Sequence, residues 1–229
     1  MNKNTNIFDK LRQLPLFLGM TQEDIAVVAG GTKFDFTSFE ADEDIVKEGE
    51  PCTRLWFLLN GKAMTTAYAD DHSYKITEYI DAPNVLQPEH IFGLHQYYTR
   101  SFKTVTACNM MSISRNEVVK LTSEQDIFRI NVLNMMAYQS QKLQRQLWHK
   151  KPSCLEQRII NFIADRCLYP AGRKVISITM NCMAEEINDT RLNMSKALNH
   201  FQQLGLIKLN RKLIEIEHLE ELIRYNSTL

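Results

Sequence analysis

The spacing of hydrophobic and polar residues changes near residue 115. Before it, short runs rich in aromatic and β-branched residues alternate with turn signals such as Asn60-Gly61 and Ala82-Pro83-Asn84. Runs of this kind are typical of antiparallel strands. We expect strands over 33–39, 55–59, 63–69, 74–80, 102–107 and 110–114. Several short strands at this spacing predict an antiparallel barrel or jelly roll.

Helical patterns precede and follow these strands. Residues 5–29 predict short helices broken at Leu14-Pro15, with Thr21 and Asp24 marking a helix start. Residues 116–150 contain no glycine or proline and predict one long helix of roughly 25 residues. Its stripe comprises Ile127, Ile130, Leu133, Ala137, Ser140 and Leu147. The stripe suits either packing on the β domain or pairing with a second copy of the helix.

A third region begins at Pro152, which ends the long helix. The pattern there predicts helices and short strands over 154–168, 175–178, 180–187, 191–204, 207–216 and 218–225, with a hairpin at 207–216. We therefore expect an α+β chain with three parts. These are a β-roll over 1–115, a long helix and hinge over 116–151, and a helical domain with a hairpin over 152–229.

Residues 179–207 have the pattern of a helix–turn–helix. Met183, Ala184 and Ile187 form the inner face of the first helix, and Asn188-Asp189 makes the turn. Thr190 is a good N-cap for the second helix, and Gly205 stops it. The core-facing positions of the second helix are Met194, Ala197, Leu198, Phe201 and Leu204. Such a pair presents the N-terminal turns of its second helix to the major groove of DNA.

The charge pattern supports a polyanion partner for this region. Lys+Arg and Asp+Glu both number 27, which excludes a uniformly basic protein. Residues 127–151 nevertheless hold five basic residues and no acidic one, and so do residues 190–214. For reading bases we expect Arg191, Leu192, Ser195, Lys196 and Asn199. For contacting phosphates, with the basic hairpin as a wing, we expect Thr190, Lys208, Arg211 and Lys212.

The remaining composition narrows the class of protein. No apolar run approaches the roughly 20 residues of a membrane helix, and the N-terminus has no apolar signal core. Five scattered cysteines, at 52, 108, 154, 167 and 182, indicate free thiols in a reducing cytoplasm. We expect no metal and no cofactor.

The whole chain resembles the Crp/Fnr family of transcription regulators, over roughly residues 8–216. The resemblance begins at Pro15-Leu-Phe17 and Gln22-Glu-Asp-Ile25. It continues through Gly49-Glu50, Phe57 and Gly61, whose spacing is the β-roll signature of cyclic-nucleotide-binding-type domains, and through Thr106-Ala-Cys108. The helix–turn–helix completes it.

This resemblance implies a homodimer joined through the long helix, with Ile130, Leu133, Ala137, Ser140 and Leu147 at the seam. It also implies an effector held between the β-roll and that helix, and recognition helices that enter successive major grooves of a palindrome. The expected partners are double-stranded DNA, a second copy of the chain and RNA polymerase, and the expected location is the cytoplasm.

Cyclic AMP is not the expected effector, because the family's phosphate cassette is altered. Pro88 or Glu89 replaces its ribose-binding acid, with no glycine before it. Its Arg-Thr pair becomes Tyr98-Thr99, and Arg100 lies beyond it. A cyclic phosphate needs a positioned guanidinium and backbone donors. The effector is therefore unidentified, and the candidate pocket residues are Glu89, Thr99, Arg100, Met136, Tyr138 and Leu143.

Two other classes of protein compete with a DNA-binding regulator, which is not an enzyme. A jelly roll also serves metal-dependent cupin enzymes, but these need a His-x-His pair, and this sequence has none. The second alternative is a nucleotide-sensing module whose helical end binds protein. The exposed Arg191 and Lys196 expected on the second helix favour DNA instead.

Overall fold

The computed structural model describes residues 7–148 and 152–226. Contacts divide the chain into two compact units. The first comprises residues 1–63 and 81–145, and the second comprises residues 64–80 and 146–229. The expected boundary near residue 150 lies close to the last of these junctions. The segment 64–80, expected within the β-roll, groups with the C-terminal residues instead.

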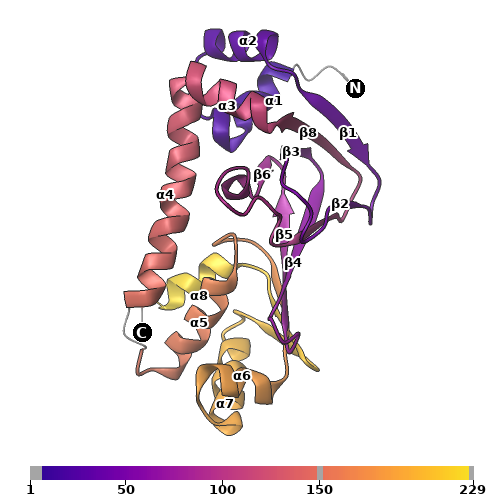
Figure 1. Cartoon of the computed structure of the whole chain (residues 1–229). Helices are drawn as coiled ribbons and strands as arrows, with labels where there is room; N and C mark the ends of the chain where they lie inside the picture. The colour runs from indigo at the N-terminus through magenta and orange to yellow at the C-terminus, as the bar shows by residue number, and fades with distance from the viewer. Residues whose placement is uncertain (1–6, 149–151, 227–229) are drawn as a thin grey trace. The chain divides into compact units, whose positions relative to one another are not determined.

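The first unit begins with helices and continues as a β-roll (Figure 1). Helices α1 (Ile7–Gln13) and α2 (Gln22–Gly31) flank the 3-10 turn η1 (Pro15–Phe17). Thr21 and Asp24 form a reciprocal capping box at the start of α2, as the sequence predicts. The strands of the roll are β1 (Asp35–Phe39), β2 (Asp44–Val46), β3 (Arg54–Asn60), β6 (Asn84–Leu86), β7 (Ser101–Thr104) and β8 (Cys108–Ser114). The 3-10 turn η2 (Pro88–His90) follows β6.

The roll is antiparallel. One sheet has the order β1-β8-β3-β6, with Phe57 opposite Met111 and Trp56 opposite Leu86. Strand β2 pairs with β7 through Val46 and Phe102. The sequence pattern missed β2 and β6 because three residues are too few to show alternation.

Gly61, in the turn directly after β3, lies very close to the neighbouring backbone. Gly61 has φ 91°, and a Cβ there would lie 2.6 Å from both the Ala107 carbonyl oxygen and the Cys108 Sγ. Gly61→Ala is therefore expected to lower the free energy of unfolding by about 2–4 kcal/mol through overlap and backbone strain. Urea denaturation measures this loss. An unchanged midpoint would contradict the close approach, and Gly49→Ala, with nothing within 4 Å of the Cβ, controls for strain alone.

The segment expected to be one long helix is two helices. Helix α3 (Arg115–Glu124) ends at Gln125, whose φ and ψ of −123° and 102° are extended. Helix α4 (Asp126–Trp148) then runs for 23 residues. The expected length of roughly 25 residues agrees with α4, whereas the expected continuity of one helix from residue 116 is wrong. Absence of glycine and proline does not guarantee continuity, and here the Gln125 N–H closes α3 on the Leu121 carbonyl while the Gln125 carbonyl begins α4 by accepting from Arg129 N.

Helix α4 packs on the β-roll through a face that the sequence stripe did not include. Phe128 is fully buried and Val132 almost so. The Phe17 ring lies 5.2 Å from the Phe128 ring and 5.7 Å from the Phe57 ring. The Asn131 amide donates to the carbonyl oxygens of Leu16 and Leu18. The first turns of α4 are thus fixed to the roll, and the stripe lies on the other side.

The second unit contains the helices of the C-terminal region and strands from both halves of the sequence. Its elements are β4 (Lys62–Tyr68), β5 (Lys75–Asp81), α5 (Leu155–Arg166), β9 (Lys174–Ser177), α6 (Met180–Ile187), α7 (Arg191–Gln203), β10 (Lys208–Asn210), β11 (Leu213–Ile216) and α8 (Leu219–Asn226). The strands follow the order β10-β11-β9-β5-β4. Every element expected after residue 152 is present within two residues of its expected bounds.

Candidate nucleic-acid interface

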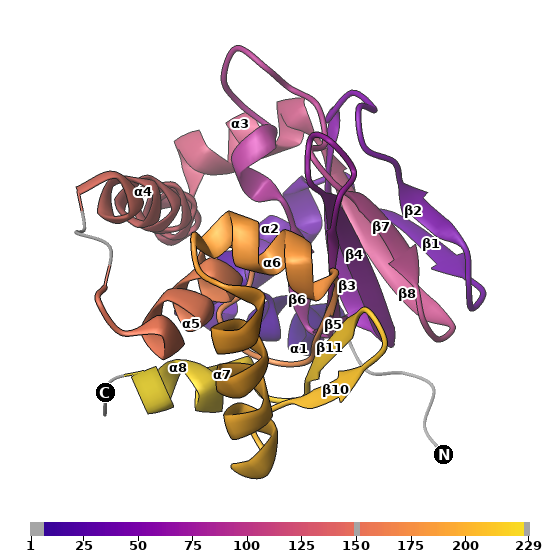
Figure 2. The same ribbon diagram turned by 90° about the horizontal axis from the view of Figure 1, so that it is seen from below.

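Helix α7 is built as an amphipathic rod. Its buried residues are Met194, Ala197, Leu198 and Phe201, as expected, whereas Leu204, expected in the core, is 47% exposed because it lies at the C-cap. The four buried residues of α7 pack in one apolar cluster with Met183, Ala184 and Ile187 of α6. Packing of these apolar residues fixes which face of α7 points outward. Figure 2 shows α7 at the outer face of this unit, beside the β10–β11 hairpin.

Hydrogen bonds define the start of α7. The Thr190 hydroxyl accepts from the Asn193 N–H at 3.2 Å, so Thr190 is the N-cap that the sequence predicts. Asn188 ends α6 in the left-handed conformation, with φ 59° and ψ 59°. The Asp189 carboxylate accepts from the Thr190 N–H at 2.7 Å and from the Asn193 amide at 2.9 Å. These bonds, with that of Arg158, hold the pKa of Asp189 below its ordinary value.

Arg158 of α5 fixes the turn between the two helices. Its guanidinium donates to Asp189 Oδ2 at 2.5 Å and to the carbonyl oxygens of Ile187 and Asn188 at 3.1 and 3.3 Å. These bonds satisfy carbonyls at the end of α6 that helix geometry leaves unpaired. An open groove of about 520 Å³ lies beside this contact, between α5 and α7. Sequence reasoning missed Arg158 because it stands outside the helix–turn–helix motif.

Replacing Arg158 with methionine is expected to loosen the turn without unfolding the domain. The partly buried ion pair and two backbone contacts disappear, so we expect a loss of about 1–3 kcal/mol in the free energy of unfolding. Thermal denaturation of Arg158→Met beside Arg129→Met provides the comparison, since Arg129 makes a more exposed pair with Asp126. Equal effects of the two changes would contradict the role of Arg158.

The expected base-reading residues lie on the outer face of α7 with one exception. Arg191, Leu192, Lys196 and Asn199 are exposed, and Leu192 is 65% exposed. Ser195 is only partly exposed. The Asn199 amide donates to the Ser195 carbonyl oxygen at 2.8 Å, so it must exchange this bond to reach a base. Within residues 152–226, neither Arg191 nor Lys196 has an acidic side chain within ion-pair distance.

The hairpin beside α7 contains three of the residues expected to contact phosphates, namely Lys208, Arg211 and Lys212. Arg211 and Lys212 form its turn, where Lys212 has φ 60°. The Leu209 N–H donates to the Gln202 side chain, which fastens the hairpin to α7. Lys208 lies 3.7 Å from Glu217, so part of its charge is compensated. The geometry thus brings Thr190, Arg211 and Lys212 to the exposed surface of the same unit as α7.

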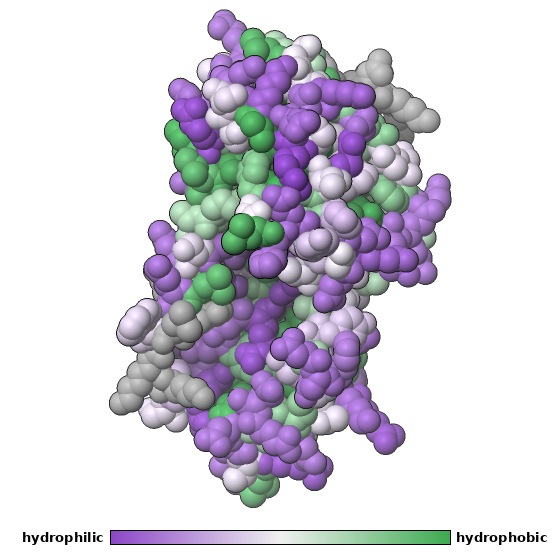
Figure 3. Space-filling model, viewed as in Figure 1, coloured by the Kyte–Doolittle hydropathy of each residue, from purple (hydrophilic) through white to green (hydrophobic). Residues whose placement is uncertain are grey.

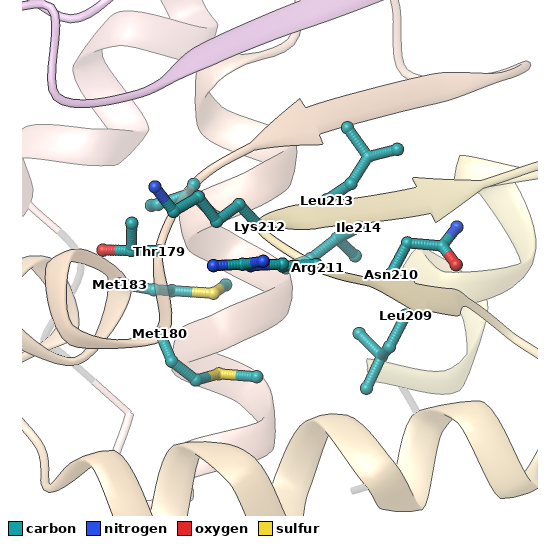
Figure 4. A pocket seen from close by; sticks show the side chains of 10 residues that line it. Thr179, Met180, Met183, Leu209, Asn210, Arg211, Lys212, Leu213 and Ile214 are labelled. Carbon is teal, nitrogen blue, oxygen red and sulfur yellow. The ribbon is translucent and has the colours of Figure 1, made fainter.

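A pocket of about 270 Å³ lies under the hairpin turn (Figure 4). Its lining includes the apolar side chains of Met180, Met183 and Ile214 and the cationic side chains of Arg211 and Lys212 (Figure 4). Thr179, which caps α6 by accepting from the Cys182 N–H, also lines it. The hairpin turn therefore places two cationic side chains beside an apolar hollow next to the start of α6.

The candidate effector residues of the first unit are brought together only in part. The Thr99 hydroxyl accepts from the Gln87 amide at 2.7 Å and lies 3.3 Å from His90 Nε2. Glu89 is mostly buried, and burial raises the pKa of its carboxyl, against the opposing charges of His90 and Arg100. Met136 is partly buried on α4, while Tyr138 and Leu143 are 50% and 60% exposed.

The expected seam of the long helix lies exposed. Ile130 and Leu133 are 52% and 58% exposed, and Ala137 and Ser140 are exposed as well. The side chain of Leu147 lies outside the described residues, as does the hinge segment 149–151. Hydrophobic side chains recur along the course of α4 in the space-filling view (Figure 3). An apolar stripe of this kind on a helix face is typical of a protein–protein contact.

Two further observations concern membranes and metals. Across residues 7–148 and 152–226, no helix combines the length and apolar character that crossing a bilayer requires. Over the same residues, no three His, Cys, Asp or Glu side chains gather as a metal ion would need. All five cysteines are free; Cys52, Cys108 and Cys167 are buried, whereas Cys154 and Cys182 are partly exposed.

Two family models match the sequence, one in each half. Residues 36–125 match the cyclic nucleotide-binding domain, and residues 157–225 match the Crp-like helix-turn-helix domain. Comparison with curated proteins finds no match.

Several solved structures are similar to this chain at low sequence identity. The catabolite activator protein of Thermus thermophilus is 15% identical, with 93% of this chain and 98% of that chain covered and a TM-score of 0.52. A transcriptional regulator of the CRP/FNR family, also from Thermus thermophilus, is 17% identical, with 84% and 98% covered and a TM-score of 0.45. FixK2 from Bradyrhizobium japonicum is 15% identical, with 84% and 96% covered and a TM-score of 0.44.

Proposed function

Since this chain belongs to the Crp/Fnr family of transcription regulators, we propose that it works in the cytoplasm as a homodimer bound to a palindromic site in double-stranded DNA. A small effector at the junction of β-roll and α4 controls it, and RNA polymerase is its second macromolecular partner. The observation that carries the proposal is the outer face of α7, where exposed Arg191 and Lys196 lie beside the basic hairpin turn.

The proposed base contacts follow from the chemistry of each exposed side chain. Arg191, one residue after the N-cap, reaches guanine O6 and N7 through two N–H donors. Lys196 donates to a guanine as a single ammonium. Leu192 offers no acceptor for cytosine, so it contacts a thymine methyl. Thr190, Lys208, Arg211 and Lys212 contact phosphates, which set register and salt dependence.

The proposed dimer uses the exposed stripe of α4. Ile130, Leu133 and Ala137 lie opposite the face that Phe128 and Val132 bury on the roll. A second copy covers these side chains by helix pairing. Two copies of α7 then enter successive major grooves about 34 Å apart.

Cyclic AMP does not fit the proposed effector site. Tyr98 and Thr99 stand where the family's Arg-Thr pair would hold the phosphate diester, and the buried Tyr98 donates its hydroxyl to the Arg54 carbonyl oxygen. We expect 1 mM cyclic AMP (roughly a thousandfold above a micromolar Kd) to leave the melting temperature unchanged. A rise of several degrees in differential scanning fluorimetry would contradict this expectation.

Selection from a pool of random duplexes tests the proposed function. The purified chain is expected to enrich an inverted repeat whose half-sites lie about 10 base pairs apart. Addition of a small-molecule cell extract is expected to increase recovery, since an effector shifts the population toward the binding arrangement. Failure to enrich any sequence, with and without extract, would refute DNA recognition.

A further inference from the structure

Most of the hairpin formed by β4 and β5 belongs to the second unit, although the residues before and after it belong to the first. Residues 64–80 belong to the second unit with residues 146–229. Strand β5 pairs antiparallel with β9 from Lys75 opposite Ser177 to Glu78 opposite Lys174. Strand β9 pairs on its other edge with β11 of the basic hairpin. The sheet that carries the wing therefore includes a strand from the first half of the sequence.

Strand β5 and Tyr74, the residue before it, also supply side chains to the core of this unit. Ile76 is 2% exposed and belongs to the same apolar cluster as Ile163, Ile176 and Ile214. The Tyr74 ring lies 5.6 Å from the Phe162 ring, and its hydroxyl accepts from Arg166 Nε at 2.7 Å. Separation of β5 from β9 would return this apolar surface to water and leave the β9 edge unpaired.

A buried ion pair lies at the end of the β5–β9 pairing. Glu78 Oε2 lies 3.1 Å from Lys174 Nζ, and both side chains are completely buried. The Glu78 carboxylate also accepts from the backbone N–H groups of Leu168 and Tyr169, at 2.6 and 3.0 Å. Lys174 donates in addition to the Ala171 carbonyl oxygen. The Glu78 carboxylate thus holds the first residues of the loop between α5 and β9.

The loop and strand held by Glu78 lead directly to the DNA-binding helices. Strand β9 ends at Ser177, and Thr179, two residues later, is the N-cap of α6. The Ile178 N–H donates to the carbonyl oxygen of Lys212 at the hairpin turn. A change in the position of β9 therefore moves both the start of α6 and the wing.

We propose that strand β5 is a working part of the DNA-binding domain and that Glu78 is a positioning residue for α7 and the wing. Without β5 from the N-terminal half of the chain, the sheet of this domain has an unpaired edge at β9. A rearrangement that shifts the β4–β5 hairpin shifts β9 with it and so changes DNA affinity. This inference rests on the proposed function for its DNA readout, whereas the pairing itself has an independent readout.

Full-length variants test the proposal by hydrogen exchange and by titration of the selected duplex. Glu78→Gln leaves the Lys174 ammonium buried without its carboxylate, and breaking a buried pair on one side is more damaging than removing both charges. We expect exchange at Leu168, Tyr169 and β9 to accelerate at least tenfold and DNA affinity to fall at least tenfold. The double variant Glu78→Gln with Lys174→Met is expected to recover most of both losses.

The matched control is Lys62→Met, which removes an exposed pair with Asp81 at the base of the same hairpin and should change neither readout. Protection in Glu78→Gln equal to that of the wild type would overturn the proposal, as would a double variant no better than the single one. Faster exchange with unchanged DNA affinity would overturn the positioning role.

If Glu78→Gln fails to fold, a folded double variant with near-wild-type affinity supports the pairing. Wild-type protein that captures no duplex, with exchange responding as expected, counts against the proposed function alone.

Discussion

Replacing Arg191 with alanine is expected to reduce discrimination between the selected site and a scrambled duplex sharply while general affinity for DNA remains. Each bidentate contact to guanine is worth about 1–3 kcal/mol, and a dimer makes two, so the loss is about 2–6 kcal/mol. This corresponds to roughly 30-fold to 10⁴-fold in affinity for the selected site. Fluorescence anisotropy titration of both duplexes measures the change.

Lys212→Ala is the matched control, because this cation lies at the hairpin turn and not on α7. It should weaken binding to both duplexes equally and reduce the slope of log K against log salt by about 1 for each phosphate that is no longer neutralised. Equal weakening on both duplexes from Arg191→Ala would remove Arg191 from base reading.

Replacing Leu133 with glutamate is expected to separate the dimer and to reduce DNA affinity at least about 100-fold, since a single subunit engages only one half-site. Leu133 is 58% exposed at the centre of the α4 stripe. Two glutamates facing each other would be desolvated in a like-charge contact. Sedimentation velocity measures the mass, and the duplex titration measures the affinity.

Val119→Glu provides the comparison for this second change. Val119 is 49% exposed on α3, so its replacement changes charge and apolar surface in a similar way away from the stripe. It should leave mass and affinity unchanged. A wild-type chain that sediments as a monomer, or a Leu133→Glu variant that sediments as a dimer, would contradict the proposed seam.

The helix–turn–helix could be predicted from sequence because local signals agree there. The Thr190 cap, the spacing of Met194, Leu198 and Phe201, and the Asn188 turn all act within a few residues. The same holds for the strands that have five or more residues. Short β2 and β6, which depend on pairing partners for their definition, gave no pattern of their own.

Features that depend on distant partners were not predictable. The stripe of α4 indicated a packing face, but Phe128 and Val132, outside the stripe, are the side chains that face the roll. Lys174 appears in the sequence as one more surface cation, and Glu78 as the polar position of an alternating strand. Their complete burial against each other follows from tertiary pairing of β5 with β9, which no local pattern encodes.

Among the candidate effector residues, too, those close in sequence could be predicted and those that depend on distant contacts could not. Glu89, Thr99 and Arg100 are close in sequence, and the structure gathers Glu89 with His90 and Arg100. Gln87, buried and bonded to Thr99, gave no sequence signal, because a single glutamine before a proline belongs to no periodic pattern. Residues on α4 were assigned from the family's arrangement, and their part in an effector site remains a prediction.

Sequence recognition by this chain depends on α7 reading base edges in the major groove through Arg191. The sharpest experiment replaces single guanines of the selected duplex with 7-deazaguanine, which removes the N7 acceptor and leaves base pairing intact. One position in each half-site is expected to weaken binding of the wild type at least tenfold and to have no further effect on Arg191→Ala. No sensitive guanine, or equal weakening of both proteins at every guanine, would contradict this mode of recognition.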